Sequence, residues 1–351
     1  MQERGPDYTG YYLDQSIGFV HTRLSIIDLN SHANQPLIKE SISLVFNGEI
    51  YNYQELRDQL KASNCTFYTN SDTEVLLEGY RVWGINKLLD KCNGMFAFAL
   101  HDKSTQTTYI ARDRYGQKPL YYAQIKDAFY FASDIRSIAN LFKGELELDL
   151  ESVEYFLTEL SVGQPKSIWK EIQQIKPSHY IEISPNTIQE KRYWQIDYQE
   201  KATNYNIEEI IEVTENKLTE AILKRTVSDV PIGCFLSGGI DSGLVTSILA
   251  QNSASRVKTF SVGLDYEKDN ELPEARIVAQ RYNTDHYELM ANVNPQDDLI
   301  DLIEYFGEPF ADSSMIPSYW ITREIKKHVT VALSGDGGDE FFGGYWDYLH
   351  C

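Results

Sequence analysis

The second half of the sequence contains a short Ser/Gly-rich segment whose residue types suit the binding of an anion. Cys234-Phe-Leu-Ser-Gly-Gly-Ile-Asp-Ser-Gly243 joins an apolar run, expected to be a strand, to the start of an expected helix. Glycine lets the backbone approach an anion closely, and the N–H groups at a helix start favour negative charge. The hydroxyl groups of Ser237 and Ser242 add donors, and the Asp241 carboxylate is a ligand type that suits magnesium. Because GxxxxGK(S/T) and GxGxxG are both absent, the segment taken alone is equally typical of an ordinary strand-to-helix turn.

Two further predicted strands end in residues of the same kind. Phe260-Ser-Val-Gly263 closes one strand, and Ser334-Gly-Asp-Gly-Gly-Asp-Glu340 follows another. In a doubly wound sheet, ligands bind at the carboxyl ends of the strands. We therefore expect these segments to meet around one nucleotide, where Asp241 and Asp339 would share the metal ion that bridges its phosphates. The alternative is that the segment 334–340 is only a solvated acidic turn.

The predicted elements divide the chain into two parts. In the first half, apolar runs predict strands at 42–46, 95–100, 107–111, 120–123 and 128–132, and helical periodicity predicts helices at 53–63 and 73–83. This pattern favours an α+β domain. From residue 207 onward, helices at 208–226, 244–251, 274–282, 295–306 and 316–328 alternate with strands at 231–236, 257–262, 286–290 and 329–333. That alternation predicts a doubly wound parallel α/β sheet. We place the domains at 1–195 and 207–351, with a polar linker at 196–206.

Composition excludes several classes of function. The 351 residues include 52 Asp and Glu against 32 Lys and Arg, which gives a net charge of −20. Such a charge disfavours binding to nucleic acid or to an anionic membrane, and no apolar run reaches the roughly 20 residues of a membrane span. The four cysteines, at 65, 92, 234 and 351, form no CxxC pair and no metal-ligand spacing. Scattered thiols in a chain of this size are typical of the reducing cytoplasm.

The Ser/Gly-rich segments of the second half carry a resemblance. Ser237-Gly-Gly-Ile-Asp-Ser242 resembles the pyrophosphate loop of the ATP pyrophosphatase superfamily. Together with the segment 334–340 and Gly343-Gly-Tyr345, it resembles the synthetase domain of glutamine-hydrolysing asparagine synthetases. The resemblance implies that Asp241 and Asp339 bind Mg2+, and that Asp336 takes the acidic position near the reacting carboxylate, where some members have Glu. It implies an ATP site made of Leu236, Ser237, Gly238, Gly239, Asp241, Ser242, Val262, Ser334 and Gly335.

The first half resembles the companion domain, a class II glutaminase with the N-terminal-nucleophile fold, in which two sheets lie between helical layers. The segments that carry this resemblance are Arg4-Gly-Pro-Asp7, His21-Thr-Arg-Leu-Ser-Ile-Ile-Asp28, Phe46-Asn-Gly-Glu-Ile-Tyr-Asn52, Ser71-Asp-Thr-Glu74 and Ala111-Arg-Asp-Arg-Tyr-Gly116. It implies that Arg23 pairs with the α-carboxylate of glutamine and that Asp72 binds its α-ammonium group. It also places Glu49 among the glutamine-binding residues. Asn47 and the Gly48 N–H would form the oxyanion hole.

Each of these residues also has a simpler interpretation when taken alone. Arg23 or Asp72 would more often form a surface ion pair of little energetic value. Asn47-Gly48 is a typical type I′ hairpin turn. The occurrence of five motifs in the family's order favours the functional interpretation.

The chain departs from the family pattern at both ends. The family's nucleophile is an N-terminal cysteine that lies a strand and a helix before the Arg-Gly-Pro-Asp motif, whereas Met1-Gln2-Glu3 precedes that motif here. Cys65 and Cys92 are interpreted as structural. The family continues beyond the position of Cys351 into a helical region. We therefore expect a chain shortened at both ends, impaired in glutamine hydrolysis and with an unpaired edge in its glutaminase sheet.

The resemblance implies an asparagine synthetase that uses glutamine, aspartate and ATP and forms β-aspartyl-AMP as its intermediate. Ammonia released in the first domain would travel internally to the second. Two alternatives stay open: a related amidotransferase with another acceptor, and an inactive fragment that binds nucleotide without turnover. The resemblance allows a homodimer, and no nucleic-acid or membrane partner is expected.

Overall fold

The computed structural model describes residues 2–197, 206–263, 271–290, 294–345 and 348. The chain divides into two compact units, one of residues 1–200 with 296–313 and one of residues 201–295 with 314–351. Most of the linker predicted at 196–206 lies outside the described residues.

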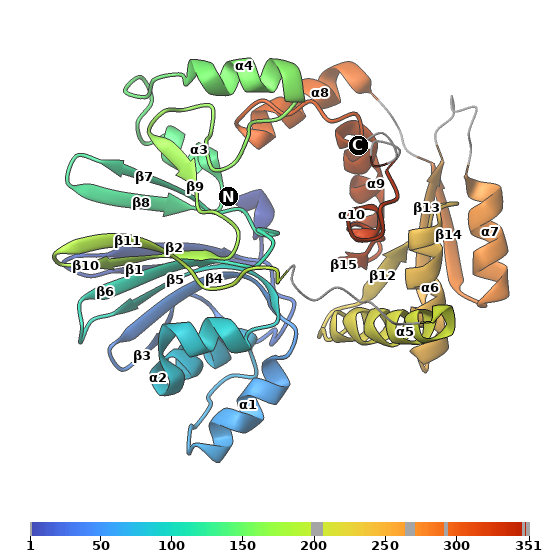
Figure 1. Cartoon of the computed structure of the whole chain (residues 1–351), viewed down its shortest axis with the longest axis horizontal. Coiled ribbons are helices and arrows are strands. Elements are labelled where there is room, and N and C mark those ends of the chain that lie inside the picture. Colours follow the sequence, from blue (N-terminus) through green and yellow to red (C-terminus); the bar gives the residue numbers. More distant parts are fainter. Residues whose placement is uncertain (1, 198–205, 264–270, 291–293, 346–347, 349–351) are drawn as a thin grey trace. The chain divides into compact units, whose positions relative to one another are not determined.

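The first unit is built on a six-stranded sheet and a three-stranded sheet (Figure 1). The larger sheet has the order β11-β10-β6-β5-β4-β3, and all of its pairs are antiparallel. Its strands are β3 (Leu37–Lys39), β4 (Ile42–Ile50), β5 (Gly94–Asp102), β6 (Thr107–Arg112), β10 (His179–Ser184) and β11 (Thr187–Arg192). The smaller sheet contains β8 (Ala128–Ala132), β7 (Tyr121–Ile125) and β9 (Ile172–Gln174), in that order. β1 (Tyr8–Leu13) and β2 (Gly18–Arg23) form a separate hairpin.

Helices cover the outer faces of the two sheets. Figure 1 shows α1 (Tyr53–Ala62) and α2 (Asp72–Lys91) below the larger sheet, and α3 (Ile135–Ala139), α4 (Leu150–Glu159) and α8 (Pro295–Phe306) beyond the smaller one. The predicted sandwich of two sheets between helices is therefore confirmed. The helix predicted to end at Trp83 continues to Lys91 after a kink at Gly84, whose φ of 72° and ψ of 171° are not helical.

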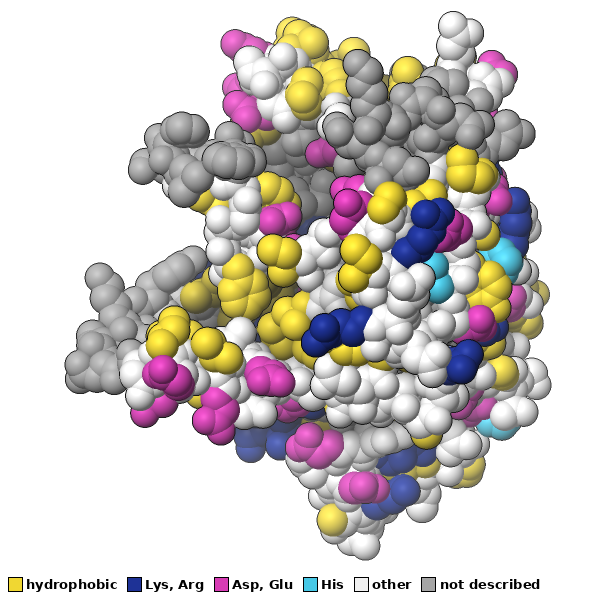
Figure 2. Space-filling model, turned by 90° about the vertical axis from the view of Figure 1, so that its right-hand side faces the viewer, with side chains coloured by type: hydrophobic (Ala, Val, Ile, Leu, Met, Phe, Trp, Pro, Cys, Tyr) yellow, Lys and Arg dark blue, Asp and Glu magenta, His cyan; other side chains and the backbone are white. Residues whose placement is uncertain are grey.

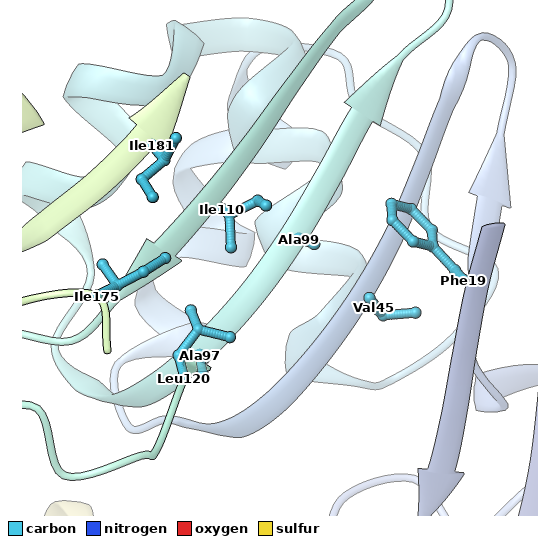
Figure 3. Packing of buried hydrophobic residues seen from close by; sticks show 8 residues of the cluster. All are labelled: Phe19, Val45, Ala97, Ala99, Ile110, Leu120, Ile175 and Ile181. Atoms are coloured by element: carbon cyan, nitrogen blue, oxygen red, sulfur yellow. The ribbon is translucent and has the colours of Figure 1, made fainter. Parts of the chain in front are cut away.

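An apolar cluster fills the space between the sheets. Figure 3 shows side chains from β2, β4, β5, β6 and β10, together with Leu120 and Ile175 from the segments that lead to and from the smaller sheet. Phe129 and Phe131 of β8 pack against this cluster. The buried members are Phe19, Val45, Ala97, Ala99, Ile110, Leu120, Ile175 and Ile181. Burial of this apolar surface supplies the main driving force that holds the layers together.

The second unit is a four-stranded parallel sheet with the order β14-β13-β12-β15, as predicted (Figure 1). The strands are β12 (Ile232–Phe235), β13 (Lys258–Gly263), β14 (Asp285–Met290) and β15 (Val331–Leu333). The helices are α5 (Ile207–Lys224), α6 (Ile240–Asn252), α7 (Leu272–Arg281), α9 (Met315–Ile325) and the short α10 (Gly338–Phe342). Cys234 packs against Ile248 and Leu249 of α6, and Phe260 packs against Ile325 of α9.

The segment 296–313 belongs to a different unit in the structure from the one that the sequence pattern predicts. The predicted domain 207–351 contains it, whereas in the structure it packs with the first unit. The Tyr121 hydroxyl donates to Glu308 Oε1 at 2.9 Å, and the Ala311 N–H donates to the Leu160 carbonyl at 2.8 Å. Helical periodicity identifies an amphipathic helix here, but it does not reveal which of the two units the apolar face of that helix contacts.

The surface carries charges of both signs. On the face shown in Figure 2, acidic and basic side chains of the described residues are interspersed with apolar ones. Within the described part of the chain, no helix is both long and apolar enough to cross a membrane.

Candidate functional sites

The first unit contains a cavity of about 670 Å³. All five residues that the resemblance assigned to glutamine line it, although they come from three separate segments of the sequence. These residues are Arg23, Asn47, Gly48, Glu49 and Asp72. The aromatic and aliphatic side chains of the inter-sheet core form much of the remaining wall, and apolar walls with a few convergent polar groups are typical of small-molecule sites.

Asn47 and Gly48 lie inside strand β4 rather than in a hairpin turn. They pair with Ala97 and Phe96 of β5 in a continuous ladder, so the turn interpretation is wrong. Gly48 has a φ of 155°, and a Cβ at this position would lie 2.1 Å from the Met95 carbonyl oxygen. Only glycine fits this approach of two backbones. The Asn47 amide donates to Ser133 Oγ at 3.2 Å, and its second N–H can serve a ligand.

Arg23 is buried and its terminal nitrogens are engaged by the loop that follows β2. Nη1 donates to the Asn30 carbonyl at 3.1 Å and to Asn34 Oδ1 at 2.8 Å. Nη2 donates to the Ile27 carbonyl at 3.3 Å and to the Asp28 carbonyl at 2.5 Å. A guanidinium group has five N–H donors, so these four bonds leave only Nε–H outside the loop contacts. A bidentate bond to a carboxylate therefore requires an exchange with the loop carbonyls.

Asp72 is buried and Glu49 is half-buried, and their carboxyl groups line the cavity together with Arg23. Asp72 is the first residue of α2, and its Oδ2 accepts from the Ile50 N–H at 3.0 Å. Burial raises the pKa of Asp72, and burial together with the nearby Asp72 charge raises the pKa of Glu49 further, against the opposing effect of Lys118. Two carboxylates in one desolvated site repel each other. A ligand ammonium group between them would relieve that repulsion.

Lys118 lines the same cavity and was not found from the sequence. Asp113 positions it, because the Asp113 carboxylate accepts hydrogen bonds from four backbone N–H groups. The donors and distances are Phe96 at 3.2 Å, Tyr115 at 3.1 Å, Gln117 at 2.9 Å and Lys118 at 2.9 Å. Arg112 completes the arrangement by donating to the Lys118 carbonyl at 2.8 Å. The Ala111-Arg-Asp-Arg-Tyr-Gly116 motif thus holds the loop in shape. Lys118, which lines the cavity, comes two residues after the motif.

The described cysteines are buried thiols that do not contribute to the lining of this cavity. Cys65, Cys92 and Cys234 are free and buried, and none of them lines it. Burial raises the pKa of Cys92 to about 12 and that of Cys234 to about 11. Since the thiolate is the reactive form, these positions agree with the structural role predicted for Cys65 and Cys92.

The second candidate site lies at the switch point of the parallel sheet. β12 pairs with β13 on one side and with β15 on the other, so the sequence order reverses at β12. The carboxyl ends of β12 and β15 lead into the segments 236–239 and 334–337. In open α/β sheets this crevice is where ligands bind.

The two segments meet at Asp241. A Cβ on Gly338 would lie 2.6 Å from Asp241 Oδ2, and a Cβ on Gly335 would lie 2.8 Å from Asp241 Cβ. Gly338 immediately precedes Asp339, so the structure brings the second predicted metal ligand to the same end of the sheet. Asp336 lies on the same segment, where its Oδ2 accepts from Ser334 Oγ at 2.9 Å.

Hydroxyl groups hold the segment after β12 in shape. Ser242 Oγ lies 2.8 Å from Ser237 Oγ and accepts from the Ser237 N–H at 3.1 Å. Ser237 Oγ in turn accepts from the Gly239 N–H at 3.1 Å. Gly239 occupies the N-cap of α6 and has no side chain to cap the helix, so the first turn of α6 presents backbone N–H groups to an anion.

Leu236 and the end of β13 form the adjoining wall. Leu236 is buried, its N–H donates to the Phe260 carbonyl at 2.9 Å, and its carbonyl accepts from Ser261 Oγ at 2.5 Å. Val262 follows Ser261 on β13. The predicted nucleotide residues therefore come from three neighbouring strand ends.

Comparisons with known proteins agree with this two-part organisation. Residues 1–194 match the family model of the glutamine amidotransferase domain, and residues 214–350 match that of asparagine synthase. The chain is 38% identical to asparagine synthetase [glutamine-hydrolyzing] 1 of Bacillus subtilis, over 97% of this chain and 54% of that protein. It is 33% identical to a putative asparagine synthetase [glutamine-hydrolyzing] 2 of Methanocaldococcus jannaschii, over 100% of this chain and 72% of that protein.

A relative with a different name also matches. The amidase chyE of Penicillium rubens is 32% identical over 97% of this chain and 53% of that protein. The chain thus spans about half the length of two of these three relatives and 72% of the third. On the family-model matches and the identities together, the chain belongs to the family of glutamine-hydrolysing asparagine synthetases.

Proposed function

We propose that this chain forms part of an asparagine synthetase that converts aspartate, glutamine and ATP into asparagine, glutamate, AMP and pyrophosphate. The observation that carries the proposal is the meeting of the two Ser/Gly-rich segments at Asp241, at the switch point of the second unit. A bound glutamine would occupy the cavity of the first unit. The proposal keeps 1–195, 196–206 and 207–351 as the division along the sequence, with the segment 296–313 packed on the first unit. It also includes a cytoplasmic location and a homodimer.

In the first unit, Asp72 and Glu49 would bind the ammonium group of glutamine, and Arg23 would bind its carboxylate after exchanging loop contacts. Asn47 and the Gly48 N–H would stabilise the oxyanion of a tetrahedral intermediate. Since none of the described cysteines lines the cavity, we expect this chain to be impaired in glutamine hydrolysis.

In the second unit, backbone N–H groups of the segment 237–242 would bind the β- and γ-phosphates of ATP. Leu236, Val262, Ser334 and Gly335 would contact the nucleoside. The aspartate β-carboxylate attacks the α-phosphorus and pyrophosphate leaves. Ammonia then attacks the acyl carbon, AMP leaves, and asparagine is released. Asp336 would act close to the reacting carboxylate.

A magnesium ion fits the donor set at this site. Asp241 and Asp339 supply carboxylate oxygens, which magnesium prefers. Because Gly335 and Gly338 have no side chains, the space beside Asp241 stays open. A Cβ at either position would fill that space. No cluster of three or more His, Cys, Asp or Glu residues suited to a metal occurs among the described residues, so phosphate oxygens and water would complete the shell. When bound, magnesium would offset the negative charge of the phosphates.

The test is a pyrophosphate-release assay with ATP, Mg2+, aspartate and ammonium, together with detection of asparagine. An Asp241→Asn variant is the control, because it removes the charge and keeps the side-chain volume. Product that depends on Asp241 supports the proposal. Nucleotide binding without product would favour the inactive nucleotide-binding fragment.

A related amidotransferase with another acceptor is the second candidate, and the similarity to a relative named as an amidase favours keeping it. It predicts pyrophosphate release with an acceptor other than aspartate. The same assay with a panel of carboxylic acids in place of aspartate separates the two candidates.

A further inference from the structure

An acidic side chain from another element is hydrogen-bonded to residues 237–242, the segment proposed to bind phosphate and called the phosphate segment below. The Gly238 N–H donates to Glu271 Oε2 at 3.0 Å. Glu271 holds the N-cap position of α7, yet its side chain forms no capping bond to that helix. Its carboxylate instead reaches a backbone donor on a different element, 33 residues away in sequence.

The contact depends on a close approach of two backbones. A Cβ on Gly238 would lie 3.2 Å from Glu271 Cβ and 3.1 Å from Glu274 Cβ. The first turn of α7 therefore lies directly against the phosphate segment. A Glu271 carboxylate displaced from the Gly238 N–H would stay beside whatever replaced it.

The geometry points to Glu271 as an internal competitor for the phosphate segment, which makes the site select metal-bound polyphosphates over free ones. This inference rests on the proposed nucleotide site. One N–H donor serves either the carboxylate or a phosphate oxygen. A free polyphosphate must displace the carboxylate and then tolerate a like charge beside it. A magnesium complex carries less negative charge, and so it meets less repulsion.

The experiment measures binding by isothermal titration calorimetry at low ionic strength, because both side chains are exposed and salt screens exposed charges. Wild type, Glu271→Gln and Glu274→Gln are titrated with sodium pyrophosphate in EDTA and with ATP in excess Mg2+. Glu274 is the matched control: its Cβ is equally close to Gly238, but within the described residues its carboxylate forms no hydrogen bond with the phosphate segment. Thermal melts verify that each variant is folded.

We expect Glu271→Gln to bind metal-free pyrophosphate about tenfold more tightly than wild type, the effect of one charge-assisted hydrogen bond at an exposed position. Its affinity for the magnesium complex of ATP should change by less than about threefold, because the complex meets less repulsion. Glu274→Gln should stay within about twofold of wild type for both ligands, as expected for an exposed charge that forms no ion pair with the described residues.

Two results overturn the inference and leave the nucleotide site intact. One is a Glu271→Gln variant that binds pyrophosphate no more tightly than wild type while the magnesium complex of ATP still binds. The other is an equal gain in Glu274→Gln, which would show a general charge effect. Failure of all three proteins to bind either ligand would overturn the nucleotide site itself, and the inference with it.

Discussion

The close approach of Gly338 to Asp241 leads to a sharp prediction about nucleotide binding. In Gly338→Ala, the new methyl group would lie 2.6 Å from Asp241 Oδ2, about 0.8 Å short of the 3.4 Å at which ordinary contact begins. The backbone of Gly338 has no positive φ, so alanine is not strained there. The cheapest relief is rotation of the Asp241 side chain away from Gly338, because its carboxylate is the group in contact.

The expected result is a folded protein that binds nucleotide poorly. The steric cost should not exceed about 1–3 kcal/mol, as for other overpacked sites. Displacing the carboxylate by about 1 Å removes a charge-assisted contact to the metal-bound phosphates, so the affinity for ATP with Mg2+ should fall about 10- to 100-fold. Calorimetric titration with ATP and excess Mg2+ measures the affinity, and thermal melting measures the stability.

Gly243→Ala is the matched control. It adds the same methyl group in α6, where the nearest atom of another element, Val278 Cγ2, is 3.8 Å away. This variant should keep its affinity and gain about 0.5–1 kcal/mol of stability from a better helix residue. A Gly338→Ala protein that is folded and binds ATP as tightly as wild type would refute the proposal that the 334–340 segment and Asp241 form one nucleotide site.

Three further predictions concern the first unit. Lys39→Met should lower the free energy of unfolding in urea by about 1–3 kcal/mol, because it removes the ammonium group from the buried Glu74 carboxylate and leaves Glu78 with Arg81 as its remaining cation. An unchanged free energy of unfolding would contradict the burial argument. Tyr121→Phe should cost about 1–2 kcal/mol by leaving the buried Glu308 carboxyl without this donor, and an unchanged melting temperature would argue against the packing of 296–313 on this unit. Glu49→Gln should be more stable than wild type, and the difference should grow as the pH rises from 5 to 8. Burial raises the pKa of Glu49 in the folded chain, so the unfolded chain loses this proton first and stability falls with increasing pH; a difference that stays constant with pH would exclude Glu49 as the cause.

Strands with one continuous apolar run were predictable, and strands without one were not. Ile42–Phe46 was found because its residues are buried on both faces of the sheet, but β4 continues to Ile50 through polar residues that line the cavity. β11 was missed because Thr187–Arg192 lies at the edge of its sheet, and five of its six residues are exposed. No apolar pattern marks such a strand. Its extended conformation is stabilised by the backbone hydrogen bonds that it forms with β10.

The candidate sites show a similar division. Residue types and spacing identified Asn47, Gly48 and Asp72, which the structure brings to one cavity. They did not indicate Lys118, because its position depends on the Asp113 carboxylate, which accepts from one N–H group of β5 and from three N–H groups of the loop after β6. They also did not reveal that Glu271 reaches Gly238, since that contact joins two loops at different strand ends. Contacts between distant segments depend on tertiary packing that periodicity does not encode.

At both sites, strong hydrogen-bond donors are bonded to acceptors of the chain itself. The terminal N–H groups of Arg23 are bonded to the loop after β2, and the Gly238 N–H is bonded to Glu271. Binding at either site is therefore an exchange of partners, and its net free energy is the difference between two sets of hydrogen bonds. Because the loop carbonyls are neutral and Glu271 is charged, the exchange at Arg23 gains a charge pair, whereas the exchange at Gly238 replaces one anion by another. The two sites should consequently differ in salt dependence: added salt should weaken the competition that the exposed Glu271 exerts against free polyphosphate, and it should affect the contacts of the buried Arg23 much less.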